Sequence, residues 1–235
     1  MRDLFGDLFG RPFGIVLYQL LEATQFTIYL SLIAFLGGGL VALIITLARV
    51  SPSKTAKVLT TGYIWVFQSV PLLMLLFLLG LGVPRLLGVN IDPWIAASIA
   101  LIVYTSAYLS DVWRGAVEAI PEGQWEAGRV LGLRFLPTVG LIILPQTFRL
   151  SLAPTVGFMV QIIKGTSLAF IIGFHDLMNV GKRWANAPVE GTEAFVIYPL
   201  MALIYFALCF PLSVWSRRLE RRLGSAANDN VPVAA

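Results

Sequence analysis

Charged residues are scarce in this chain of 235 residues: they make up 13% of the sequence, whereas hydrophobic residues make up 57%. A water-soluble domain carries roughly a quarter charged residues. If the chain folded in water, its apolar surface would exceed what soluble monomers tolerate. The composition therefore excludes a soluble globular protein and predicts an integral membrane protein with a positive mean hydropathy of +0.81.

Residues that commonly carry chemistry are also rare, with one cysteine and one histidine. Cys209 has no partner for an internal disulfide and lies in an apolar run, which favours a packing role. His175 and Asp176 are adjacent, but the sequence has neither an HExxH motif nor a cysteine cluster, so we expect no catalytic residue and no metal site. No Walker A motif occurs, because Gly181-Lys182 lacks the spaced glycine and is followed by arginine.

The net charge of +4 does not indicate a nucleic-acid-binding protein. Such proteins gather basic residues on one exposed face, often together with aromatic residues. Here the basic residues flank apolar runs, where they hold loops on the cytoplasmic side of a membrane.

Apolar runs of about 20 residues or more are long enough to cross a hydrocarbon layer of about 30 Å as helices. The first run is too long for the hydrophobic region of a signal peptide, so we expect no cleavable signal. A shorter run, Phe135–Leu144, is interrupted by Pro137 and followed by Pro145, and we expect it to lead the chain into the fourth span. We place five spans near residues 26–48, 58–83, 94–114, 149–173 and 194–215.

The basic residues of the loops predict the orientation of these spans. Three segments are rich in arginine and lysine: the loops after the first and third spans and the segment after the fifth. The other two loops are short of basic residues or balance them with acidic ones. Because basic loops stay in the cytoplasm, we expect the N-terminus outside and the C-terminus inside.

Both ends of the chain differ in composition from the transmembrane domain at 26–223. In residues 1–25, apolar residues recur at roughly helical spacing until Pro12 interrupts them, which favours a short amphipathic segment on the membrane surface. A disordered leader remains the alternative. Residues 224–235 are small and polar, which predicts a disordered tail.

The longest polar interruption, at about residues 115–148, contains an informative motif. A Glu-Ala-small triplet is followed by Gly after three residues and, after nine more, by Ile-x-Leu-Pro. Its members are Glu126, Ala127, Gly128, Gly132, Ile142, Leu144 and Pro145. The motif resembles the "EAA" loop of the membrane subunits of bacterial ATP-binding-cassette (ABC) importers, in which a short cytoplasmic helix docks into a separate ATPase. The predicted orientation independently places this loop in the cytoplasm.

Other segments, in the same order, resemble the permeases of polar amino acid importers that carry histidine, glutamate, glutamine, arginine or opines. The resemblance covers about residues 27–223 and rests on Phe67–Leu73, Tyr108–Gly115, Gly123–Ala127, Leu144–Gln146 and Lys164–Leu168. It implies an all-α permease with the fold of type I ABC importers, in a bacterial inner membrane. It also implies that the substrate is a polar amino acid or an opine-like derivative.

The sequence departs from the family pattern at several positions. Gln68-Ser69-Val70 replaces Arg-Gly-Thr, and Asp111 replaces Glu. Gly165 stands where the family has Asp, and Gly157 where it commonly has Asn. The last two changes prevent a transfer of substrate identity from the family to this chain.

The resemblance assigns a coupling role to one short segment. We expect a helix over 122–131, with an acidic first turn favoured by the helix dipole and with Gly132 ending it. Glu126 would meet basic or polar groups of the ATPase, and Ala127 and Gly128 would allow close backbone approach. An ordinary solvated linker helix is the alternative. The candidate coupling residues are Glu122, Gln124, Glu126, Ala127, Gly128 and Gly132.

Polar residues inside the predicted spans are candidates for the substrate pathway. In the fourth span, Gly157, Gln161 and Lys164 share one helical face, and a charge in a membrane is costly unless it faces a cavity or a partner. A structural Lys164 that pairs with Asp111 or Asp176, or that snorkels, remains equally possible. Gln68 and Ser69 either line the pathway or bond neighbouring helices. The candidate pathway residues are Gln68, Ser69, Gly157, Gln161, Lys164, Thr166 and Ser167.

Five spans are too few to enclose a pathway alone, which predicts a homodimer or a heterodimer with a paralogous permease. The resemblance adds a dimer of ATPase subunits, an extracytoplasmic solute-binding protein and surrounding lipid as partners. We expect no cofactor on this chain and no enzymatic activity, with ATP and Mg²⁺ used by the partner ATPase. An ion-coupled secondary transporter or channel subunit is the alternative, although intramembrane acidic residues are few. A membrane-embedded enzyme has almost no support.

Overall fold

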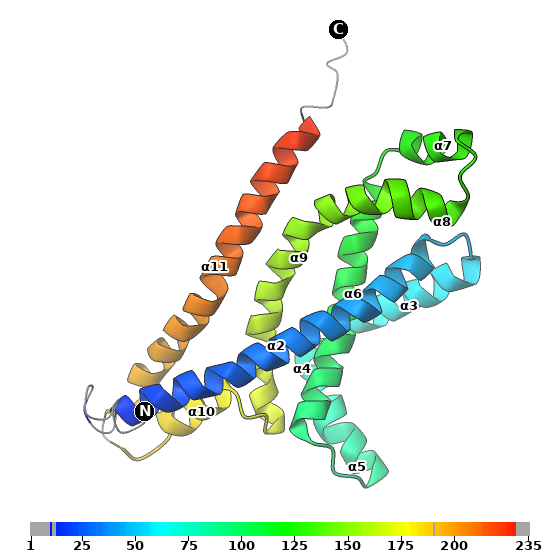
Figure 1. Cartoon of the computed structure of the whole chain (residues 1–235). Coiled ribbons are helices and arrows are strands. Elements are labelled where there is room, and N and C mark those ends of the chain that lie inside the picture. The colour runs from blue at the N-terminus through cyan, green and yellow to red at the C-terminus, as the bar shows by residue number, and fades with distance from the viewer. Residues whose placement is uncertain (1–9, 11–12, 190, 229–235) are drawn as a thin grey trace.

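The computed structural model describes residues 10, 13–189 and 191–228, with side chains up to residue 223. The described residues are helices and connecting turns, without a strand. Figure 1 shows long helices that cross one another, with shorter helices at both ends. The helices are α2 (Phe13–Val50), α3 (Lys54–Ser69), α4 (Leu72–Phe77), α5 (Val83–Leu87), α6 (Pro93–Glu118), α7 (Glu122–Val130), α8 (Phe135–Thr138), α9 (Leu144–Thr166), α10 (Leu177–Ala185) and α11 (Ala194–Asn228). Two π-helices, η1 (Leu78–Gly82) and η2 (Val139–Ile143), and the 3₁₀ helix η3 (Ser167–Ile172) join them.

Four helices of the described chain are long and apolar enough to cross a membrane, and there are five candidate spans when one bent pair of helices is counted as a single broken span. This agrees with the five predicted spans. The pair is α3 with α4–α5, bent by 96° at Val70 and Pro71. Pro71 lacks a backbone N–H and disfavours helical geometry in the residue before it, which explains the break.

The spans are longer than hydropathy predicts. The first helix begins at Phe13 rather than near residue 26, so residues 13–25 are continuous with the helix of the first span. The rest of the predicted interfacial segment, apart from Gly10, lies outside the described residues. The fourth begins at Phe135 and runs through η2 and α9 to Ile172. Helix α11 continues to Asn228, where the sequence predicts a disordered tail from Gly224. Hydropathy detects the apolar part of a helix, whereas backbone hydrogen bonds extend the helix into polar segments.

Close contact between α2 and α6 forms the largest helix interface. An added Cβ at Gly38 would lie 2.5 Å from the Cβ of Thr105, and one at Gly37 would lie 2.8 Å from Ile102 Cδ1. The absence of side chains at these glycines lets the two helices approach each other, as small residues do in membrane helix packing. The main core lies beside this interface, where α2, α4, α6, α9 and η3 bury side chains such as Leu30, Leu101 and Ile172.

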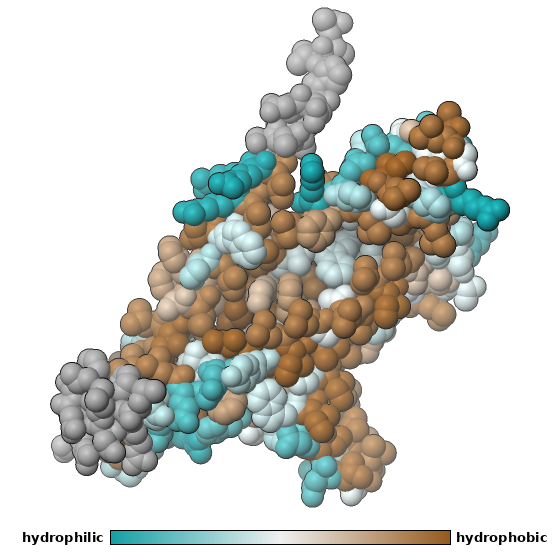
Figure 2. Space-filling model, in the orientation of Figure 1, coloured by the Kyte–Doolittle hydropathy of each residue, from teal (hydrophilic) through white to brown (hydrophobic). Residues whose placement is uncertain are grey.

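Apolar residues cover the middle of the molecule and polar residues gather at its ends (Figure 2). One polar end holds α7 and the C-terminal part of α11; α10 lies at the other. Large side chains on the middle of α2 remain exposed, for example Leu36 at 62% and Leu40 at 67%. An apolar band with polar ends is the surface expected of a chain whose middle faces lipid.

Candidate functional site

The predicted coupling helix is present as α7, one residue shorter than the sequence indicates. It begins after Pro121, and Glu122 occupies its first turn. At its other end Gly132 adopts a positive φ of 72°. The Gly132 N–H donates to the Arg129 carbonyl and the Leu133 N–H to the Gly128 carbonyl, both at 3.0 Å. This pair of bonds is a Schellman motif, which requires a left-handed residue at the position of Gly132.

The side chains of α7 divide into an exposed face and a packed face. Glu122, Gln124, Glu126 and Ala127 are exposed. Gln124 Oε1 accepts a hydrogen bond of 3.3 Å from Gln146 Nε2. Within the described chain Glu126 makes no hydrogen bond or ion pair, so its carboxylate is available to a partner.

Gly128 belongs to the packed face and is buried. A Cβ at this position would lie 2.6 Å from Thr138 Cγ2 and 2.9 Å from Thr138 Oγ1. The sequence suggests that Gly128 admits the backbone of a partner; in the structure the close neighbour is α8 of the same chain. Its small size therefore docks α7 onto the start of the fourth span.

An aromatic contact supports the same docking. The rings of Trp125 and Phe135 stack with their centroids 6.4 Å apart. Trp125 also packs against a cluster formed by Val117 at the end of α6, Ile120 in the turn that follows, and Ile143 of η2. Helix α7 is thus held to both the third and the fourth span, so that a displacement of α7 acts on both.

A group of charges lies beside α7 that sequence reasoning missed. Asp111 Oδ1 lies 3.0 Å from Arg114 Nη2 and 3.9 Å from Arg49 Nη1, and Arg114 also pairs with Glu118. Asp111 therefore does not pair with Lys164, as one sequence alternative suggests. The spacing of Asp111, Arg114 and Glu118 at three and four residues on one helix was the signal available in the sequence.

The polar interruption of the second span lies at the break between α3 and α4. Gln68 Nε2 donates to the Ala107 carbonyl (3.4 Å), and Tyr108 Oη donates to the Gln68 carbonyl (3.5 Å). Gln68 thus joins α3 to α6, as in the alternative that this residue bonds neighbouring helices. Ser69 beside it is exposed.

Gln161 and Lys164 lie on the exposed face of α9. Within the described chain Lys164 forms no ion pair, and neither Asp111 nor Asp176 reaches it. Gly157 instead faces α11, where an added Cβ would lie 3.2 Å from Ser216 Oγ. The predicted stripe is therefore divided between one packing position and two exposed polar side chains.

Thr166 and Ser167, the other predicted pathway residues of this segment, use their hydroxyl groups in local hydrogen bonds. Thr166 is fully buried and donates to the Ile163 carbonyl of its own helix, and Ser167 donates to the Lys164 carbonyl. A Cβ at Gly165 would lie 2.9 Å from Leu72 Cδ2. This contact brings the end of α9 next to the break between α3 and α4, so the structure brings the two polar interruptions together.

Three aromatic rings join α6 to α9, and none of them was among the residues that the sequence predicted for the site. The rings of Tyr108 and Phe158 stack at 5.5 Å between centroids, and Tyr104 lies 4.6 Å from Tyr108. Tyr104 and Tyr108 are four residues apart on α6 and therefore share a helix face. The contact with Phe158, which is distant in sequence, has no local signal.

Asp176 and His175 are adjacent in sequence but make separate contacts. Asp176 is fully buried and caps α10, where its Oδ1 accepts a 2.9 Å bond from the Asn179 N–H. Burial raises the pKa of this carboxyl to about 7. Burial, followed by the charge of Arg183, lowers the pKa of His175, whose Nδ1 lies 3.1 Å from Arg183. Across the described chain no three His, Cys, Asp or Glu side chains gather in a metal-binding group.

Comparison with known protein families gives one match that covers most of the chain. Residues 34–225 match the family described as "Binding-protein-dependent transport system inner membrane component". The match includes α7 and both polar interruptions.

Curated relatives agree with this match. The L-cystine transport system permease protein TcyB of Bacillus subtilis is 34% identical over 198 residues, which cover 84% of this chain and 83% of the relative. The glutamine transport system permease protein GlnP of Escherichia coli is 30% identical over 205 residues, which cover 87% and 92%.

Solved structures share the fold. A crystal structure of an amino acid ABC transporter with histidines has a TM-score of 0.79 and 28% identity, covering 87% of this chain and 94% of that one. An inward-facing structure of the MetNI methionine ABC transporter has a TM-score of 0.71 over 88% of this chain and 96% of that one. Its identity of 17% makes it evidence for the fold alone.

Proposed function

The chain belongs to the family of inner membrane components of binding-protein-dependent transport systems, and we propose that it is the permease subunit of an ABC importer for a polar amino acid or an amino acid derivative. Relatives named for L-cystine and glutamine transport support this substrate class. The observation that carries the proposal is the EAA-like segment, which forms an exposed helix joined to two spans.

In this proposal α7 transmits the motion of a partner ATPase, which binds and hydrolyses ATP with Mg²⁺. Its exposed face presents Glu122, Gln124, Glu126 and Ala127 to the partner, while Gly128 and Gly132 fix the position and the end of the helix. A short helix that packs through Trp125 and Gly128 moves with the spans as one unit, because packed interfaces shift between discrete arrangements.

The substrate pathway lies between this permease and a second one, either an identical copy or a paralogue. The exposed face of α9 with Gln161 and Lys164 supports this placement, since a charge at membrane depth favours a polar cavity. Ser69 and Ser167 would adjoin this pathway, while Gln68, Gly157 and Thr166 would support its walls through their packing and hydrogen bonds. An extracytoplasmic binding protein would deliver the solute.

Co-purification and uptake test this function. When the tagged chain is expressed with its native neighbours and purified gently in detergent, we expect an ATPase to co-purify. A second permease would indicate a heteromer, and its absence a homodimer. Reconstituted vesicles should take up a polar amino acid only with ATP and binding protein. Uptake that continues without ATP would instead support the ion-coupled alternative.

The placement of Lys164 beside the substrate pathway can be tested by replacing its side chain. Lys164→Met should lower the rate of uptake about tenfold at fixed binding-protein concentration, because the exposed ammonium no longer faces the solute or its gate. Co-purification of the ATPase should persist, since Lys164 makes no ion pair within the described chain. Arg85→Met, an exposed cation on α5 outside the proposed pathway, is the matched control. Equal uptake rates in the two variants would contradict the assignment.

A further inference from the structure

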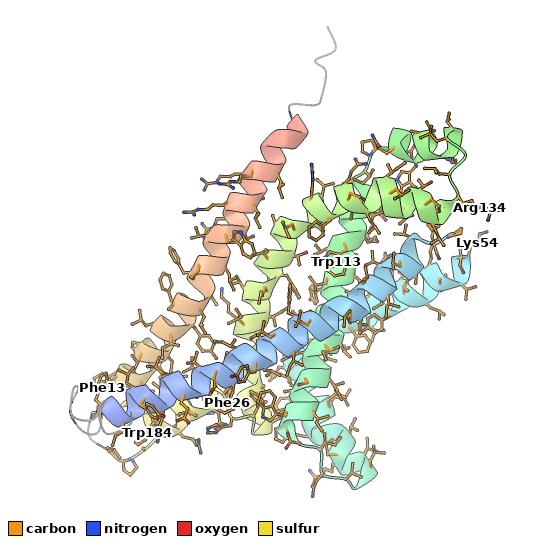
Figure 3. All side chains as sticks on the ribbon, viewed as in Figure 1. Phe13, Phe26, Lys54, Trp113, Arg134 and Trp184 are labelled. Carbon is orange, nitrogen blue, oxygen red and sulfur yellow. The ribbon has the colours of Figure 1, made fainter. Side chains whose placement is uncertain are left out.

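A basic cavity of about 730 Å³ lies between α7 and the ends of α2, α3 and α6. It is lined by four cations and two carboxylates: Arg49, Lys57, Arg114, Arg129, Glu118 and Glu122. Figure 3 labels Lys54 and Arg134 at the end of the molecule that holds α7 and, by its lining residues, the cavity. Neither of these two residues lines it.

The positive charges of the cavity are not all neutralised. Arg114 is held by Asp111 and Glu118. Arg49 Nη1 is buried, has no hydrogen-bond partner and lies 3.9 Å from Asp111. Lys57 and Arg129 are exposed and form no ion pair within the described chain. Lys57 and Arg129 therefore have no carboxylate partner, and Arg49, whose ion pair with Asp111 is long, keeps a buried N–H group without a hydrogen-bond acceptor. Glu122 is the one lining carboxylate outside an ion pair.

An apolar cavity of about 420 Å³ adjoins the basic one. The two cavities share Val50, Val117 and Phe135 as lining residues. The apolar cavity is otherwise lined mainly by side chains of α2, α6, α8, η2 and α9, and several of these side chains are exposed. Leu47 is 44% exposed and Phe148 is 64% exposed.

We infer that the joined cavities bind an anionic phospholipid. The phosphate would lie among Arg49, Lys57 and Arg129, and an acyl chain would lie along Leu47 and Phe148. Basic pockets beside membrane helices select anionic head groups, while the apolar continuation favours a lipid over a free phosphate ion. The lipid would then contact the coupling helix and the ends of three spans, through α2, α3 and α9. This inference does not depend on the coupling role of α7.

The test measures lipid retention by the purified complex. The complex is equilibrated with an equimolar mixture of phosphatidylglycerol and phosphatidylcholine, and native mass spectrometry counts the bound lipids. The variant Lys57→Gln/Arg129→Gln should retain about tenfold less phosphatidylglycerol, since each cation near an anionic lipid contributes to its attraction. The control Lys54→Gln/Arg134→Gln removes the same two charge types from the same end, outside the cavity. It should retain as much as the unchanged complex.

Two further arms identify the ligand. Leu47→Trp should narrow the apolar cavity and lower the retention of long-chain phosphatidylglycerol, with little effect on a short-chain analogue. Millimolar inorganic phosphate should not displace the long-chain lipid. If phosphate displaced it, the proposal that the ligand is a phospholipid would be overturned, and a free anion would be the ligand instead. Equal losses in the two double variants would overturn the site, because surface charge would then account for retention. No loss in either variant would overturn it as well.

Discussion

Glu126→Lys should abolish ATP-driven uptake, with a loss of at least tenfold, while the chain still inserts in the membrane. Glu126 is exposed on α7 and bonds to nothing within the described chain, so its replacement costs the isolated permease little. In the proposed complex this carboxylate meets basic or polar groups of the ATPase. A reversed charge at such a contact costs several kcal/mol. We therefore expect uptake to be lost while ATP hydrolysis continues.

Reconstituted vesicles allow ATP hydrolysis and solute uptake to be measured on one preparation. Glu220→Lys is a suitable control, because it reverses an exposed acidic residue in the C-terminal part of α11. That part of α11 lies at the same end of the molecule as α7 (Figure 1). The control should keep both activities. If Glu126→Lys also keeps the ratio of uptake to hydrolysis, α7 does not transmit the motion through this residue.

The number of spans could be read from the sequence because a bilayer imposes a length on apolar runs. The ends of the helices could not be read from the sequence. In α2, for example, the first turns contain Gln19 and Glu22, which lower the hydropathy without ending the helix. The 96° bend at Pro71 was visible only as a polar interruption. A proline marks a break, whereas the angle depends on packing against α6 and η3.

In the candidate site, too, the sequence predicted local features but not the contacts between distant segments. Helix α7 and its terminal Gly132 follow from local pattern, since both depend on neighbouring residues. The roles of Gly128 and Gly157 do not, because each faces a distant segment, Thr138 in one case and Ser216 in the other. The pairing of Arg49 with Asp111 likewise joins two spans. A single sequence gives the residue types at these positions but not the partners that decide their function.

Gly128→Ala should uncouple uptake about as severely as Glu126→Lys, through packing instead of charge. The added methyl group would lie 2.6 Å from Thr138 Cγ2, so α7 would have to move away from α8. Overpacking of this kind costs about 1–3 kcal/mol, although alanine favours the helix by roughly 1 kcal/mol. The measurement is again uptake relative to hydrolysis. Gly123→Ala is the control on the same helix, because its Cβ would meet nothing within 4 Å.

A second substitution separates the docking of α7 from a general loss of stability. Thr138→Ala removes the Cγ2 and Oγ1 atoms that the new methyl group would strike, leaving the Cβ at 3.3 Å. The double variant Gly128→Ala/Thr138→Ala should therefore recover most of the uptake, a non-additive result that identifies direct contact. Additive losses would mean that Gly128 acts elsewhere, for instance against the ATPase. Recovery would show that coupling requires α7 to rest on the fourth span, because only then does a motion of α7 displace the helix that carries Gln161 and Lys164.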